Sequence, residues 1–196
     1  MSLAFRIIPK LDIKGSDLVK GIKLEGLRVL GKPEIFAKKY YEGGADELIY
    51  QDVVASLYNR NGLHNIIEKT ASQIFIPLTV GGGVRNIEDI KKILRSGADK
   101  ISINTAAHEN PHFISEAAQI FGCSTIVVSI EAIKQKDGKY IAFTDNGRNS
   151  SNREVVEWAK QVESLGAGEI LLINVDIDGT GAGPDKSLVE SISKKV

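Results

Sequence analysis

The heptapeptide GADELIY at residues 44–50 recurs later in the chain as GAGEILL at residues 166–172. Each copy leads into an acidic strand end, at Asp52 in the first case and at Asp176 and Asp178 in the second. A repeat of this kind indicates a fold assembled from copies of one supersecondary unit.

Around the repeat, short runs rich in Val, Ile and Leu alternate with longer amphipathic segments. The predicted strands are Phe5–Asp12, Glu47–Asp52, Ile76–Val80, Asp99–Ile103, Thr125–Glu131 and Glu169–Asn174. The predicted helices are Pro33–Glu42, Gly62–Gln73, Asn86–Ser96, Asn110–Phe121, Arg153–Leu165 and Asp185–Lys195. Strands this apolar are typical of a parallel sheet covered by helices, and the regular alternation indicates a doubly wound sheet or a barrel.

The repeat favours the barrel. Strand one is predicted to end at Asp12 and strand five at Glu131. Each is followed, before the next helix, by an additional β-rich segment with a Gly turn, which we call its excursion. The predicted fold class is therefore α/β, a (β/α)8 TIM barrel of two half-barrel repeats, in a single domain over residues 1–196. A full barrel typically needs about 250 residues. We therefore expect about six βα units here, with the last two absent and the chain inactive by itself; the alternative is a complete open sheet of six units.

The composition limits the possible partners. A formal net charge of zero offers no electrostatic footprint for nucleic acid or an anionic membrane, and no apolar run approaches the roughly 18 residues of a membrane span. The single cysteine, Cys123, is expected to be a packed thiol and fits a reducing, cytoplasmic location. His64, His108 and His112 are interpreted as surface-helix residues without metal-ligand partners, so no metal site is predicted.

Two carboxylates are candidates for catalysis. Asp12 and Glu131 fall at equivalent strand ends of the two halves, and barrel active sites lie at the C-terminal ends of the strands. Opposed carboxylates suit general acid and base work, because different environments separate their pKa values. The alternative is that either residue only caps the turn that follows it.

A second group of residues predicts phosphate binding. Gly82 and Gly83 lie between a buried strand and a helix, where backbone N–H groups can approach an anion closely. Asn104 and Thr105 end the next strand and are expected to hold the same phosphate. Lys20 follows the first strand's excursion and is a candidate for a phosphate or a developing negative charge. The alternatives are a tight glycine turn and a solvent-facing lysine.

Charged residues are also predicted at the opposite end of the strands. Strand parity places four of them near the closed end of the barrel, namely Arg6, Glu47, Lys100 and Glu169. Charges there are costly unless they are paired. The ring is therefore either a self-neutralising plug or a gated passage for a small polar molecule.

Together these residues resemble the cyclase subunit of imidazole glycerol phosphate synthase. The matching stretches are RIIP at residues 6–9, LDIK at 11–14, VKG at 19–21, ADEL at 45–48, TVGGG at 79–83, GADK at 97–100, SINTAA at 102–107, GAGEILL at 166–172 and DIDGT at 176–180. The resemblance implies cyclisation of an amino-ribulosyl carboxamide nucleotide with ammonia, without a cofactor. The products would be imidazole glycerol phosphate and an aminoimidazole carboxamide ribonucleotide. It also implies a glutaminase partner at the barrel bottom, which delivers ammonia through the charged ring.

The same resemblance implies roles for single residues. Asp12 would be the principal acid or base, and its counterpart, an aspartate in the family pattern, is Glu131 here. Asp178 would contact substrate or order the sixth loop, or be only a solubilising turn residue. Lys10 stands where the family usually carries a small residue, and the loop at residues 146–152 also departs from the usual type.

These departures leave other functions open. One is a paralogue that keeps the glutaminase interface but serves the amidation of a nucleotide-activated surface sugar. Another is a non-catalytic scaffold that binds a phosphorylated ligand or a protein. The isomerase of the same pathway shares the half-barrel repeat but lacks the charged ring and the DIDGT run.

Overall fold

A computed structural model describes residues 5–55 and 63–196. The chain divides into two compact units, the first within residues 1–19 and 29–101 and the second within residues 20–28 and 102–196. Each unit is described by itself, and the single domain expected over the whole chain stays a prediction. In the described part of the chain, no helix is both long enough and apolar enough to cross a membrane.

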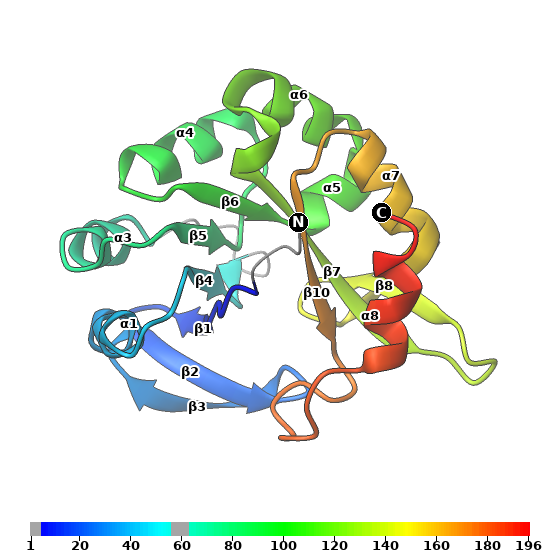
Figure 1. Cartoon of the computed structure of the whole chain (residues 1–196), viewed down its shortest axis with the longest axis horizontal. Helices are drawn as coiled ribbons and strands as arrows, with labels where there is room; N and C mark the ends of the chain where they lie inside the picture. The colour runs from blue at the N-terminus through cyan, green and yellow to red at the C-terminus, as the bar shows by residue number, and fades with distance from the viewer. Residues whose placement is uncertain (1–4, 56–62) are drawn as a thin grey trace. The chain divides into compact units, whose positions relative to one another are not determined.

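The first unit is built on parallel strands with a helix after each (Figure 1). Its elements are β1 (Lys10–Lys14), the beginning of β2 (Asp17–Ile22), the end of β3 (Glu25–Gly31), α1 (Pro33–Glu42), β4 (Leu48–Asp52), α3 (His64–Ala71), β5 (Leu78–Gly81), α4 (Ile87–Arg95) and the beginning of β6 (Lys100–Ile103). Strands β1 and β4 are parallel, as are β4 and β5. Strand β2 returns antiparallel along β1 and forms the predicted excursion.

The second unit repeats this plan. Its elements are the end of β2, the beginning of β3, the end of β6, α5 (Thr105–Glu109), α6 (His112–Phe121), η1 (Cys123–Thr125), β7 (Ile126–Lys134), β8 (Tyr140–Thr144), β9 (Asn149–Glu154), α7 (Val155–Ser164), β10 (Glu169–Asn174) and α8 (Lys186–Ser193). Strand β10 runs parallel to β7, whereas β8 and β9 form an antiparallel excursion beside it (Figure 1). An α/β fold with parallel central strands is therefore confirmed, and closure into a barrel stays a prediction.

Local sequence explains where the elements begin and which face they bury. Helix α4 begins after Asn86, whose side chain accepts a hydrogen bond from the backbone N–H of Asp89 at 2.9 Å. Its apolar stripe buries Ile90 and Ile93 completely. On the strands, Ile13 and Leu48 of the first unit and Ile130 of the second are likewise fully buried. At about 1.5–3 kcal/mol for each such side chain, this burial is the main stabilising contribution.

Four expectations about the elements are wrong. The strand predicted from Phe5 begins only at Lys10, because Phe5 and Ile7 have exposed side chains and Pro9 has no N–H to donate. The helix predicted from Arg153 begins at Val155 and is preceded by β9. The helix predicted over 110–121 is shorter, with α5 before it. Cys123 is exposed in η1 and is not a packed thiol. Gly62, the predicted start of another helix, lies outside the described residues.

Candidate functional site

Asp12 lies buried in the middle of β1, with 3% of its surface exposed. Its neighbours in register are Val19 on β2 and Gln51 on β4, and Gln51 is in turn level with Gly81 at the end of β5. Lys10, two residues before Asp12 and on the same face of the strand, donates a hydrogen bond from Nζ to Asp12 Oδ1. The carboxylate that the sequence singles out is therefore ion-paired and level with the start of the glycine turn.

The glycine turn after β5 has a conformation that needs glycine. Gly82 has φ +102°, and a Cβ built on it would lie 2.4 Å from the backbone oxygen of Asp52. Gly83 also has a positive φ of 71°. The helix that follows begins only at Ile87, and Asn86 already binds a backbone N–H of its first turn. An anion at this turn would therefore rely on the amides of the glycines rather than on the helix N-terminus.

In the second unit, Glu131 occupies the place on β7 that Asp12 occupies on β1. It is 7% exposed, level with Phe143 on the antiparallel β8 and with Ile173 on the parallel β10. The backbone N–H of Gly147 donates to Glu131 Oε2 at 2.7 Å. Gly147 ends a run of three residues with positive φ. This turn aims a main-chain amide at the carboxylate and holds it in one position.

The turn that binds Glu131 is a feature that the sequence analysis missed. Asp145, Asn146 and Gly147 have φ values of 53°, 62° and 77°. Asp, Asn and Gly are the residues that tolerate this left-handed region best. The run of these three residue types was therefore the signal for a tight turn at this point.

Asn104 and Thr105 lie at the start of α5 and bond to the end of β8. Asn104 Nδ2 donates to the carbonyl of Phe143 at 3.4 Å, and Thr105 Oγ1 donates to Asp145 Oδ1 at 3.4 Å. Gly82 and Gly83 belong to the first unit and these two residues to the second. Binding of one phosphate by all four therefore stays a prediction.

Lys20 and Asp178 were predicted separately, and the structure brings them together. Lys20 Nζ lies 3.1 Å from Oδ1 and 2.8 Å from Oδ2 of Asp178. The backbone N–H of Lys23 donates to the carbonyl of Asp178 at 2.8 Å. The loop after β10 is thus tied to the end of the first excursion by a charged contact and a backbone contact.

Three members of the predicted charged ring lie together in the first unit. Buried Glu47 accepts from Arg6 Nη1 at 2.5 Å and from Lys100 Nζ at 2.9 Å. Glu169, the first residue of β10, belongs to the second unit, so its place in the ring stays a prediction.

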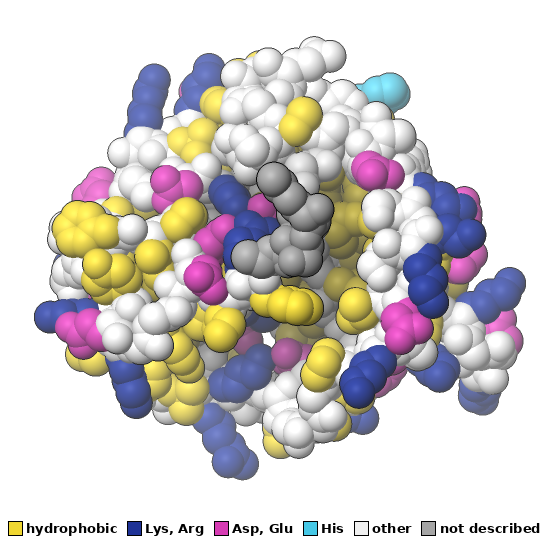
Figure 2. All heavy atoms as spheres, viewed as in Figure 1, with side chains coloured by type: hydrophobic (Ala, Val, Ile, Leu, Met, Phe, Trp, Pro, Cys, Tyr) yellow, Lys and Arg dark blue, Asp and Glu magenta, His cyan; other side chains and the backbone are white. Residues whose placement is uncertain are grey.

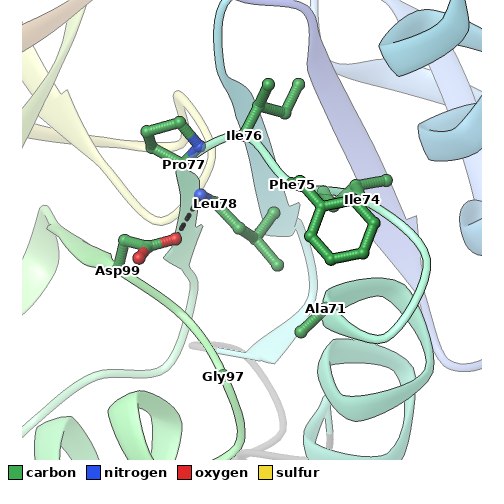
Figure 3. A pocket seen from close by; sticks show the side chains of 8 residues that line it. All are labelled: Ala71, Ile74, Phe75, Ile76, Pro77, Leu78, Gly97 and Asp99. Atoms are coloured by element: carbon green, nitrogen blue, oxygen red, sulfur yellow. Dashed lines mark hydrogen bonds between the residues drawn. The ribbon is translucent and has the colours of Figure 1, made fainter.

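A pocket of about 360 Å³ opens beside this cluster, at the start of β5 (Figure 3). Its wall includes Ile76, Pro77 and Asp99, whose Oδ2 accepts from the backbone N–H of Leu78 at 2.8 Å. Phe75, at its edge, is 83% exposed and meets the ring of Tyr41 edge-on. Figure 2 shows hydrophobic side chains gathered over α3 and the loop before β5, with charged side chains next to them. An apolar surface with a charged border is typical of a protein–protein contact.

Comparison with known proteins gives one matching family and close relatives. The family described as "Histidine biosynthesis protein" matches residues 6–196. "Imidazole glycerol phosphate synthase subunit HisF" of Legionella pneumophila is 52% identical over 191 residues, which cover 97% of this chain and 90% of that protein. The protein of the same name from Bacillus cereus (strain G9842) is 47% identical over 194 residues, 99% of this chain and 77% of the relative.

Proposed function

Because this chain belongs to the histidine biosynthesis protein family, we propose that it is the cyclase subunit of imidazole glycerol phosphate synthase. It would use ammonia to convert an amino-ribulosyl carboxamide nucleotide into imidazole glycerol phosphate and an aminoimidazole carboxamide ribonucleotide. Both relatives carry the name of that subunit. We place the reaction in the cytoplasm, without a cofactor.

The observation that carries the proposal is the matched pair of buried carboxylates. Asp12 and Glu131 each lie on a strand with a parallel neighbour on one side and an antiparallel excursion on the other. Ring closure with ammonia requires a proton to leave the attacking nitrogen and another to reach the departing oxygen. Two fixed carboxyl groups, one ionised and one protonated, can perform these transfers.

The other predicted residues would bind the substrate. The amides of Gly82 and Gly83, with Asn104 and Thr105, would hold one phosphate. The ion pair of Lys20 with Asp178 would order the loop after β10 and place an ammonium group near developing negative charge.

The decisive test is ammonium-driven turnover of the nucleotide by the chain as given, without a partner. We expect Asp12→Asn to lower turnover by about a hundredfold or more, because general acid–base catalysis typically contributes at least that factor. The matched control is Asp17→Asn, which removes a half-exposed carboxylate of β2 that pairs with Lys32.

The outcomes of this assay separate the alternatives. Equal turnover by Asp12→Asn and the unmodified chain would favour a non-catalytic scaffold. The comparisons lend no support to the expectation that the chain is inactive alone, and turnover by this chain would overturn it.

A glutaminase partner follows from the subunit named in the relatives. We propose that it docks where Phe75 and the pocket at β5 border the ion pairs of Glu47. Phe75→Ala should weaken association with the glutaminase subunit by about tenfold or more, as expected for a central apolar anchor. Val29→Ala, which trims an exposed hydrophobic residue on β3, is the matched control.

The passage of ammonia has its own test. Glu47→Gln should lower glutamine-dependent turnover in the complex and leave ammonium-dependent turnover unchanged. Equal loss in both assays would assign Glu47 to the stability of the fold instead.

The sugar-amidation paralogue remains the second candidate because of two observations at the site. Glu131 replaces the aspartate of the family pattern and bonds to Gly147, and the Lys10 ammonium contacts Asp12. If a folded chain gives no turnover with the nucleotide but supports amidation of a nucleotide-activated sugar, this candidate would be preferred.

A further inference from the structure

A second pocket, of about 290 Å³, lies wholly within the second unit. Thr105, proposed above to hold a substrate phosphate, forms part of its wall, and its other lining residues have no part in the proposed reaction. It opens between α5, the end of β8 and β9. Its walls carry Arg153 on β9 and Asp145 in the turn after β8, with Glu109 at the end of α5. A pocket of this size is at the small end of known ligand sites and fits a metabolite rather than a nucleotide.

Arg153 contributes a positive charge that no carboxylate of the described residues neutralises. Its guanidinium lies 4.4 Å from the centre of the Trp158 ring, and Nη2 donates to the carbonyl of His108 at 3.3 Å. Nη1 is buried and has no hydrogen-bond partner in the part of the chain that the structure describes. Within residues 5–55 and 63–196, no carboxylate lies within 4.0 Å of this group. Stacking on Trp158 and the carbonyl contact hold the cation in place.

Asp145 contributes a negative charge that is bound only by neutral groups. Thr105 Oγ1 and Thr144 Oγ1 each donate to it at 3.4 Å, and Asn149 Nδ2 donates at 2.6 Å. The nearby Arg148 reaches only the backbone carbonyl of Asp145, also at 3.4 Å. The carboxylate is therefore fixed in position while its charge remains uncompensated among the described residues.

The separation of these two charges follows from helix α5. Asp145 bonds to Thr105 and Arg153 bonds to His108, and these two helix residues are three positions apart. Residues at this spacing are neighbours about 5–6 Å apart on the helix surface. The carboxylate and the guanidinium are thus anchored at different residues of α5, and they form no ion pair with each other among the described residues.

The charge arrangement decides which class of molecule fits. A simple anion would be attracted to Arg153 but repelled by Asp145 and Glu109, and a simple cation would be repelled by Arg153. His108 adds no charge near neutral pH, since burial and Arg153 lower its pKa to about 4. A molecule with a carboxylate and an ammonium group on the same carbon atom satisfies both sides of the pocket.

We propose that this pocket binds an α-amino acid in its zwitterionic form. The α-carboxylate lies toward Arg153, and the α-ammonium group lies toward Asp145. The site goes beyond the proposed cyclisation, because it takes a ligand that is neither the nucleotide substrate nor ammonia.

Trp158 is the only tryptophan of the chain and provides a direct readout. Its buried ring stacks on His108 with centroids 4.5 Å apart and also contacts Arg153. Binding in the pocket should therefore change its fluorescence. The probes are glycine, L-alanine, L-glutamine and L-histidine, each titrated singly and checked by calorimetry. Acetate and methylammonium are controls that each carry only one of the two charged groups of an amino acid. Inorganic phosphate is the control for a simple anion.

We expect at least one of the four amino acids to bind with a Kd of about 1 mM or tighter. Acetate, methylammonium and phosphate should bind at least about tenfold more weakly. Arg153→Gln and Asp145→Asn should each weaken the amino acid by about tenfold to a hundredfold, the usual range for a lost charge-assisted hydrogen bond. Arg148→Gln, a neighbouring arginine outside the pocket wall, should leave binding unchanged.

Three results would overturn the proposal: no binding by any of the four amino acids at millimolar concentration, equal binding of phosphate, or unchanged affinity in Arg153→Gln and Asp145→Asn. Because Asp145→Asn keeps the shape of the side chain and Asn tolerates a positive φ, it decides the question even if Arg153→Gln does not fold.

Discussion

Lowering the pH should destabilise this protein through one histidine. His108 packs its ring on Trp158, with centroids 4.5 Å apart. Both of its ring nitrogens are buried, and neither has a hydrogen-bond partner among the described residues. Burial, and next the neighbouring guanidinium of Arg153, lower the pKa of His108 from 6.5 to about 4. The folded chain therefore keeps this imidazole neutral at a pH where the unfolded chain has already protonated it.

The sign and size of the effect follow from this difference in pKa. Between pH 6.5 and about 4 the unfolded chain binds more protons, so stability is fully present above pH 6.5 and is lost as the pH falls toward 4. Without any reduction for contact with water, a pKa difference this large corresponds to about 3 kcal/mol of unfolding free energy. Because the ring is partly exposed to water, we expect a smaller loss of about 1–2 kcal/mol.

The assay is urea denaturation at pH 7 and at pH 5, followed by Trp158 fluorescence, for the unmodified chain and for His108→Gln. The unmodified chain should lose about 1 kcal/mol more unfolding free energy between the two pH values than the variant does, because pH 5 covers only part of the interval between the two pKa values. His112→Gln, at the exposed start of α6, should behave like the unmodified chain. An equal pH dependence in His108→Gln and the unmodified chain would refute the reasoning.

Three further predictions concern other contacts. Gly82→Ala should lower the unfolding free energy by about 2 kcal/mol or more in urea titrations, because its Cβ would meet the Asp52 backbone at 2.4 Å with φ at +102°; wild-type stability would contradict this. Glu131→Asp withdraws the carboxylate from the Gly147 N–H and should lower ammonium-driven turnover by about a hundredfold; a rise in turnover would show that the aspartate of the family pattern works better here. Asp185→Ala removes the N-cap of α8 and should cost about 1 kcal/mol near pH 7. Hydrogen bonds, chiefly from Tyr140, lower the pKa of Asp185 from 3.8 to about 2. The difference between Asp185→Ala and the unmodified chain should therefore shrink as the pH falls from 3.8 through 2, and a constant difference would argue against this.

The parallel strands were predictable because their signal is local. Runs of Val, Ile and Leu with glycine at their ends are visible within a few residues, and the repeat relates the two copies. The strand predicted from Phe5 began too early because an apolar residue in the sequence can lie either on the protein surface or in the core of a sheet. Hydrophobic pattern alone cannot separate the two.

Parts of the candidate site depend on contacts that no local pattern records. Lys20 and Asp178 form an ion pair across 158 positions of the chain. His108, expected on a helix surface, is instead stacked on Trp158, and Arg153, expected at the start of a helix, lies on β9 against the same ring. These contacts depend on the tertiary fold.

The hydrogen bond from Gly147 to Glu131 has a consequence for how this protein can evolve. One hydrogen bond to the carboxylate comes from a main-chain amide, which a change of the neighbouring side chains does not by itself remove. Gly147 itself is constrained by its φ of +77° and by Val175, 3.1 Å from where a Cβ would lie. Side-chain substitutions at residues 148–152 can therefore accumulate while this backbone hydrogen bond to Glu131 persists.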